Sequence, residues 1–171
     1  MSILTQAVYE AYPEQKVVGL CHNIENTARD LAGYLGVPVE DLSYDCAGVN
    51  HMCWFMSLRI GAEDAYPRLW EASRNPEIVA KDKVRFELMR VFGRFISESS
   101  EHNAEYTPHF LRSDKEIANY DVPVDEYVRR SERNLRRYAE TRRKLLAGEA
   151  FPIERSVEYG SLIIHAMVTG E

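Results

Sequence analysis

The chain has 171 residues, 45% of them hydrophobic, which is enough for one ordinary domain with a buried core. Its formal net charge of −6 argues against general nucleic-acid binding, and no apolar run approaches the roughly 20 residues of a membrane span. The N-terminal residues do not form an export signal, and three cysteines do not suggest a disulfide framework, so we expect a cytoplasmic protein.

The first 60 residues predict two helices and three short strands. Apolar side chains at helical spacing form the first helix, which Pro13 closes. Asn23 is a suitable N-cap for the second helix, and Gly36 is a suitable residue just after its end. The predicted segments are helices over residues 2–12 and 24–35 and strands over residues 16–21, 42–49 and 51–60.

The rest of the chain is mostly helical by pattern, and we expect an α/β (α+β) fold that is rich in helix and has a small sheet. An arginine-rich helix with a narrow apolar stripe could bind phosphates, or its charges could form a solvated face with internal ion pairs. The expected segments are helices over residues 83–93, 123–146 and 155–168 and a polar loop over residues 96–110.

Two short stretches carry side chains that bind metals or move protons. Cys21 and His22 end the first strand, and His51 follows the bend after the second strand. A strand–helix–strand layout could bring Cys21 and His51 together at strand ends, where open α/β sheets place their ligand sites. A thiolate and an imidazole suit zinc, manganese or iron. Alternatively, Cys21 is a plain core residue and His51 is a structural hydrogen-bond donor.

Two further groups could carry chemistry. Cys46 and Cys53 could join Cys21 and His51 in a structural zinc site, although paired ligands of such sites usually lie about two to four residues apart. The segment Glu98-Ser99-Ser100-Glu101-His102 is dense in groups that transfer protons, and it is either a solvated loop or part of a site.

Several motifs follow one another over nearly the whole chain. They are Gly19-Leu20-Cys21-His22, Cys46-Ala47-Gly48-Val49-Asn50-His51-Met52, Glu98-Ser99-Ser100-Glu101-His102, Glu105-Tyr106-Thr107-Pro108 and Ser156-Val157-Glu158-Tyr159. In this order and at this spacing they resemble family 4 of the glycoside hydrolases, and the α-galactosidase (melibiase) type is the most similar branch that we can name. Together the motifs are far more specific than any one of them alone.

The resemblance implies a fold like the C-terminal catalytic domain of that family, which is similar to the C-terminal domain of lactate and malate dehydrogenases. Members are longer, and they begin with a Rossmann domain for NAD, whose glycine fingerprint is absent here. We therefore expect an internal fragment that is inactive alone. Residues 1–21 would be the end of the nucleotide-binding domain, and residues 22–171 would be part of the substrate and metal domain, without its C-terminal end.

The resemblance also implies an unusual chemistry. NAD oxidises the sugar at carbon 3, a divalent metal (usually Mn²⁺) polarises the neighbouring oxygens, and a base removes the proton on carbon 2. The leaving group is then eliminated, water adds and the ketone is reduced. On this chain, Cys21 and His51 match the metal ligands of the family. The substrate would be a glycoside, and we expect a homo-oligomer, either a dimer or a tetramer.

Further site residues follow from the same resemblance. His22 and Asn50 lie next to the metal ligands and would contact sugar hydroxyls or the leaving oxygen, His22 as a catalytic group. Glu98, Glu101 and His102 match a substrate-binding motif at the rim of the pocket.

Arg94 marks a departure from the family pattern. It takes the place of a tyrosine that relatives often carry, and a tyrosine near this position serves as the base in part of the family. A guanidinium does not deprotonate in proteins, so Arg94 cannot be that base. Because its fork suits a carboxylate, Arg94 could instead pair with a uronic acid, which would favour α-galacturonides over α-galactosides.

Two other classes of function remain open from the residues alone. The chain could be a helical interaction or assembly module without catalysis. It could also be a structural zinc-binding domain.

Overall fold

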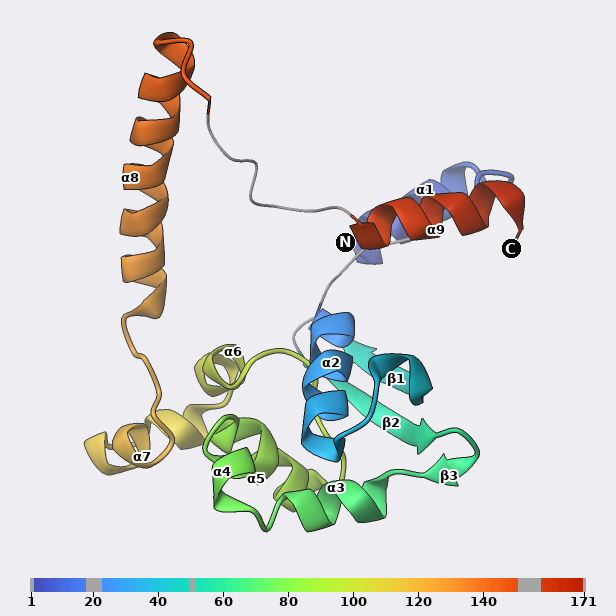
Figure 1. Cartoon of the computed structure of the whole chain (residues 1–171), viewed down its shortest axis with the longest axis vertical. Helices are drawn as coiled ribbons and strands as arrows, with labels where there is room; N and C mark the ends of the chain where they lie inside the picture. The colour runs from blue at the N-terminus through green and yellow to red at the C-terminus, as the bar shows by residue number, and fades with distance from the viewer. Residues whose placement is uncertain (1, 18–22, 50–51, 151–157, 171) are drawn as a thin grey trace. The chain divides into compact units, whose positions relative to one another are not determined.

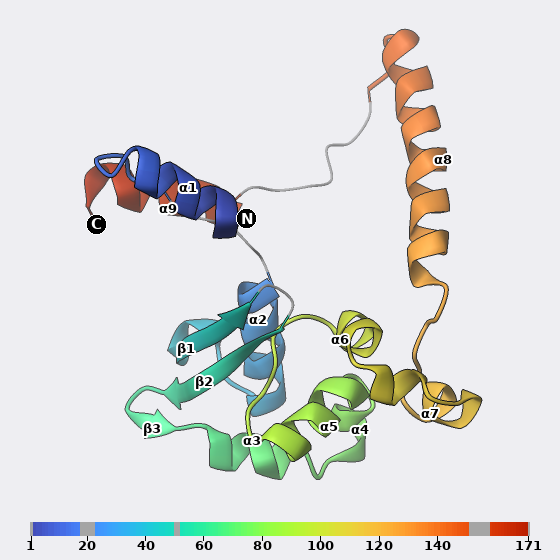
Figure 2. The same cartoon turned by 180° about the vertical axis from the view of Figure 1, so that it is seen from behind.

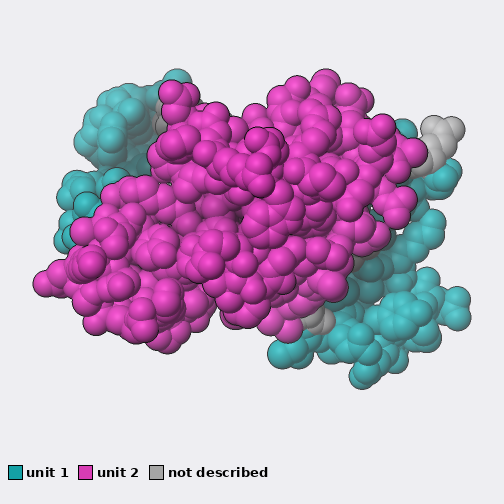
Figure 3. Space-filling view, turned by 90° about the horizontal axis from the view of Figure 1, so that it is seen from below, with its two compact units in different colours: residues 1–21, 125–171 teal, residues 22–124 magenta. Residues whose placement is uncertain are grey.

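The computed structural model describes residues 2–17, 23–49, 52–150 and 158–170. They fall into two compact units, which Figure 3 colours differently: residues 22–124 form unit 2, and residues 1–21 with 125–171 form unit 1. Most elements are helices (Figure 1). No helix in the described ranges combines the length and apolarity that crossing a membrane requires.

Unit 2 contains a three-stranded antiparallel sheet in the order β1-β2-β3. Its strands are β1 (Leu42–Val49), β2 (Met52–Ile60) and the short β3 (Glu63–Asp64). Gly48 is required near the end of β1, because a Cβ atom there would lie 2.3 Å from the Met52 carbonyl oxygen and its φ is +138°. Helix α2 covers one face of the sheet, as the two opposite views in Figures 1 and 2 show.

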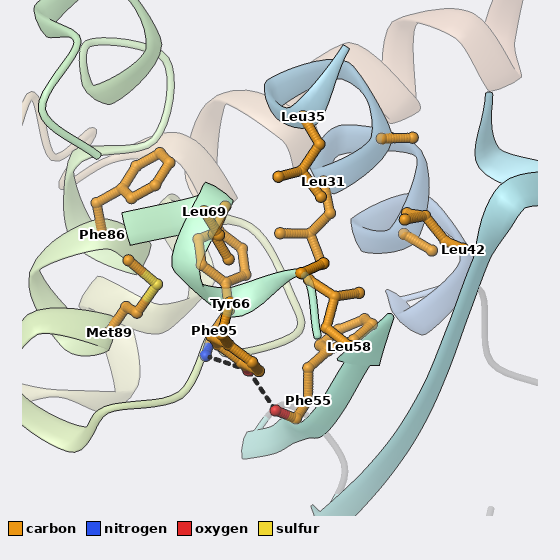
Figure 4. Packing of buried hydrophobic residues seen from close by; sticks show 13 residues of the cluster. Leu31, Leu35, Leu42, Phe55, Leu58, Tyr66, Leu69, Phe86, Met89 and Phe95 are labelled. Carbon is orange, nitrogen blue, oxygen red and sulfur yellow. Dashed lines mark hydrogen bonds between the residues drawn. The ribbon is translucent and has the colours of Figure 1, made fainter. Parts of the chain in front are cut away.

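The helices of unit 2 pack beside this sheet; α2 and η1 precede it in the chain, and the others follow it. The core lies where α2, β2, α3 and α5 converge, and it includes Leu31, Leu58, Leu69 and Met89 (Figure 4). These helices are α2 (Asn23–Leu35), η1 (Val39–Asp41), α3 (Tyr66–Ala72), α4 (Pro76–Val79), α5 (Lys83–Phe92), α6 (Ser100–Tyr106), η2 (Pro108–Leu111) and α7 (Asp114–Asn119).

Unit 1 is made of the helices α1 (Ser2–Ala11), α8 (Glu126–Leu146) and α9 (Glu158–Thr169). Helices α1 and α9 lie side by side in both views (Figures 1 and 2). The Lys16 ammonium, just after α1, donates a 2.6 Å hydrogen bond to the Met167 carbonyl oxygen of α9.

The expected fold class is confirmed, since the described residues are rich in helix and have a small sheet. The predicted helices correspond to α1, α2, α5, α8 and α9, and the last two predicted strands correspond to β1 and β2. The described strand pairs are all antiparallel, so they do not show the parallel edge of an open α/β sheet. The first predicted strand lies mostly outside the described residues.

The predicted polar loop over residues 96–110 was wrong, because this segment contains α6 and η2. Ser99 caps α6 by accepting a hydrogen bond from the His102 amide. Ala104 and Phe110 supply the apolar contacts of a second core cluster. A helix of only two turns contains too few apolar residues to show a clear period, which is why hydrophobic spacing did not reveal it.

Candidate functional site

The segment after α5 continues the sheet beside β2 and places the first candidate residues. The Phe55 amide donates to the Phe95 carbonyl oxygen at 2.9 Å, and the Ser97 amide donates to the Cys53 carbonyl oxygen at 2.7 Å. The two segments run antiparallel, so Glu98 follows at the end of β2 where Met52 begins the strand. His51 directly precedes Met52 in the sequence. This part of the fold therefore places Glu98 beside Met52, the first residue of β2.

Glu98 has a backbone conformation that is unusual for its residue type. Its φ is 76°, in the left-handed region that glycine normally occupies. Asn103, which is fully buried, holds this turn: its side-chain amide lies 3.1 Å from the Ser97 carbonyl oxygen, 3.3 Å from that of Glu98 and 3.1 Å from that of Ser99. A strained non-glycine residue that its surroundings hold in place is typical of functional sites.

The first turn of α6 holds the next candidates. Ser99 Oγ lies 3.1 Å from His102 Nδ1, so the hydroxyl orients the half-buried imidazole. Glu101 is exposed on the same short helix. Glu98, Glu101 and His102 thus lie on the turn and the short helix that follow the segment beside β2, and their side chains can accept and donate protons.

A buried ionic network anchors the start of α6. Asp82 is almost fully buried and accepts hydrogen bonds from the Ser100 hydroxyl and, at 2.8 Å, from the Tyr34 hydroxyl. Arg85 pairs with Asp82 and lies 2.7 Å from Asp30. Burial, and then the Asp82 carboxylate, raise the pKa of the Tyr34 hydroxyl far above its usual value. Burial opposes the charge of Arg85, but Asp82 outweighs it and raises the pKa of the guanidinium.

Arg94 lies at the opposite end of the same segment. Its Nε donates to the Met56 carbonyl oxygen at 3.1 Å, and its guanidinium stacks on Tyr66 at 4.9 Å from the ring centroid. It lines a pocket of about 270 Å³ with Arg59 and Asp64. Four strand residues, or about 13 Å, separate its position from that of Glu98. The structure therefore does not bring Arg94 together with the other candidates.

The remaining predicted site residues, Cys21, His22, Asn50 and His51, lie outside the described residues. Within the described ranges, no three His, Cys, Asp or Glu side chains gather as a metal site. Cys46 and Cys53 are neighbours on paired strands, and burial, followed by Cys53, raises the pKa of the Cys46 thiol to about 12. The structural zinc hypothesis also needs Cys21 and His51, so the described residues do not test it.

Sequence reasoning missed the residues that support the candidates. Asn103 follows directly after the motif Glu98–His102, but nothing in the sequence indicates that its side chain turns back to three carbonyl groups. Asp82 and Arg85 are three residues apart in a helix-like stretch, where exposed ion pairs are common. Their burial depends on α2, which lies about 50 residues earlier in the chain. No local signal could have shown it.

The chain is similar to known proteins over most of its length. Residues 46–171 match the model of the family 4 glycosyl hydrolase C-terminal domain. An alpha-galactosidase of Bacillus subtilis is 37% identical over 174 residues, which is 100% of this chain and 40% of that protein. Alpha-galacturonidases also match, at 22% to 25% identity. The chain thus spans about two fifths of the length of the curated relatives it matches.

Solved structures show the same fold. The crystal structure of the Bacillus subtilis protein lplD superposes with a TM-score of 0.71 at 22% identity, over 97% of this chain and 43% of that one. A 6-phospho-alpha-glucosidase from gut microorganisms, solved in complex with NAD and Mn²⁺, has a TM-score of 0.56 at 22% identity. It covers 96% of this chain and 40% of the neighbour.

Proposed function

Since this chain belongs to family 4 of the glycosyl hydrolases, we propose that it is part of an α-glycosidase of the α-galactosidase type. The observation that carries this proposal is the 37% identity to an alpha-galactosidase along the whole chain. The proposed reaction is the hydrolysis of a glycoside by oxidation, elimination, addition of water and reduction, as the family resemblance implies. Because the chain spans only part of its relatives, the activity belongs to a longer protein.

We propose NAD and Mn²⁺ as cofactors, the former bound mainly by a domain that this chain does not contain. Cys21 and His51 would hold the metal, and their thiolate and imidazole suit Mn²⁺ or a similar divalent ion. A solved neighbour in complex with NAD and Mn²⁺ supports both cofactors. When bound, the metal supplies Lewis-acid polarisation of the sugar oxygens, and NAD accepts and returns a hydride.

The chain's own residues have the following proposed roles. His22 and Asn50 orient the sugar through its hydroxyls, next to the metal ligands in the sequence. Glu98 enters the site from the strained turn beside β2, where its carboxylate binds a sugar hydroxyl. His102, oriented by Ser99, holds a proton on its imidazole at the rim, and Glu101 contacts the outer part of the substrate.

The surroundings of Arg94 favour a galactoside over a galacturonide. Its guanidinium stacks on Tyr66 and donates to the carbonyl oxygens of Met56 and Gly93, so main-chain groups already occupy much of its fork. Its distance from the Glu98 turn exceeds the size of one sugar ring. In the longer enzyme, Arg94→Tyr should leave the ratio of activities on nitrophenyl α-galactoside and α-galacturonide unchanged. A ratio that shifts towards the galactoside would restore the uronic-acid hypothesis.

The experiment for the function uses the longer protein with NAD, Mn²⁺ and a thiol reductant. We expect hydrolysis of p-nitrophenyl α-galactoside that requires both cofactors. Cys21→Ser and His51→Ala should abolish activity and the binding of Mn²⁺ in equilibrium dialysis, whereas the matched control Cys53→Ser should keep both. Hydrolysis that persists after removal of NAD, or in either ligand variant, would contradict the proposal. We also propose that the enzyme is a homo-oligomer, as the family resemblance implies, and that it is cytoplasmic, which the free thiols of Cys46 and Cys53 favour.

A further inference from the structure

Helix α8 has an apolar stripe that nothing in the described part of the chain covers. The helix has 21 residues, and none of them is buried. Six apolar or aromatic side chains of α8 are between 49% and 74% exposed. At about 100° per residue, they all lie within one arc of about 100°. They are Tyr127, Val128, Leu135, Tyr138, Leu145 and Leu146.

The spacing of this stripe is symmetric along the helix. Leu135 and Tyr138 lie equally far from the midpoint between residues 136 and 137, and so do Val128 and Leu145. Tyr127 and Leu146 form a third such pair. If a second copy of the helix packed antiparallel on the first, the apolar side chains of each helix would therefore contact apolar side chains of the other. A surface that is complementary to itself is what a two-fold interface requires.

The charges select the antiparallel direction. Residues 125–134 carry three acidic and three basic side chains, whereas residues 135–146 carry five basic and one acidic. A parallel pair of helices would place the two strongly basic halves side by side. Arg142, which lies within the stripe, would then face Arg142 of the partner subunit. In an antiparallel pair, Arg142 instead faces the small Ser131 and the neighbouring Glu132 of the partner subunit. Neither Arg142 nor Glu132 has an ion-pair partner within the described chain.

We propose that α8 is an interface on which two copies of this chain pair antiparallel, with Leu135 packed on Tyr138 of the partner subunit. Arg142 of each copy pairs with Glu132 of the partner subunit. This inference does not depend on the proposed reaction, because it follows from the helix alone. It assigns the expected homo-oligomer a specific surface and register, as in an antiparallel coiled coil.

The first test measures the oligomeric state of the chain by analytical ultracentrifugation at several concentrations. We expect a dimer, and Leu135→Asp should raise its dissociation constant about 100-fold or more, because it removes two buried contacts per dimer. Arg133→Asp is the matched control: it changes charge on the opposite face of the same helix and should have a much smaller effect. A monomeric chain, or equal effects of the two substitutions, would overturn the proposal.

Two further tests establish register and direction. Glu132→Arg and Arg142→Glu should each weaken the dimer, and the double exchange should restore it. Oxidative cross-linking should join Val128→Cys chains to Leu145→Cys chains in a mixture, while Val128→Cys alone should not cross-link, since the two positions lie about 25 Å apart along the helix. The unsubstituted chain controls for the native thiols. Cross-linking of Val128→Cys to itself would indicate a parallel pair and refute the register.

Discussion

Removing the hydroxyl of Tyr66 is a small chemical change that we expect to destabilise unit 2 strongly. This residue is almost fully buried, and its hydroxyl donates to the Phe55 carbonyl oxygen and accepts from the Phe95 amide, at 3.1 Å (Figure 4). It thereby joins α3 to β2 and to the segment that leads to Glu98. Tyr66→Phe keeps the ring and leaves both main-chain groups without this partner in the core.

An unpaired buried polar group costs about 1–3 kcal/mol, so two of them should lower the free energy of unfolding by about 2–6 kcal/mol. With a urea dependence of about 2 kcal/mol per molar, the midpoint should fall by about 1–3 M. Both tryptophans of the chain, Trp54 and Trp70, lie in unit 2. Their fluorescence therefore reports the unfolding of this unit.

The matched control is Tyr44→Phe. Tyr44 also contacts Phe55, with ring centroids 5.1 Å apart, but its hydroxyl has no hydrogen-bond partner in the ranges that the structure describes. This substitution should change the free energy of unfolding by less than about 0.5 kcal/mol. If Tyr66→Phe shifts the midpoint no more than Tyr44→Phe does, the hydroxyl does not hold the segment to the sheet, and the reasoning is refuted.

Three other predictions concern the site and its support. Asn103→Ala should lower the free energy of unfolding by about 2–4 kcal/mol in urea titrations, because three carbonyl groups lose their donor and a cavity forms. As a control, Asn119→Ala, at an exposed position, should change the free energy of unfolding by less than about 0.5 kcal/mol. Because the pKa of Tyr34 is raised in the folded chain, the unfolded chain loses this proton at a lower pH, so the free energy of unfolding should fall as the pH rises above about 10. Tyr34→Phe should make this fall shallower in urea titrations between pH 8 and 11. An unchanged pH dependence would contradict the prediction. With its pKa at about 12 instead of 9.0, Cys46 should carry about a thousandfold less thiolate at pH 8, so Cys46→Ser should not reduce the number of thiols that react rapidly with Ellman's reagent.

Much of the secondary structure was predictable because the signals are local. The stripe Ala28, Leu31, Ala32 and Leu35 recurs at helical spacing, and the same side chains are buried in α2. Alternation over residues 52–60 predicted β2. The short helices α3, α4, α6 and α7 were not predicted, because each has seven residues or fewer and depends on caps and tertiary contacts.

The sequence by itself determined the family, because several motifs in a fixed order identify a family that any single residue would leave ambiguous. It also determined the long helices and supplied the candidate site residues, since residue types carry their own chemistry. The tertiary structure alone decided which candidates meet. Antiparallel pairing beside β2 carries Glu98 to the end where Met52 begins the strand and holds Arg94 at the other end. Such placement depends on hydrogen bonds between segments some 40 residues apart, which no local pattern records.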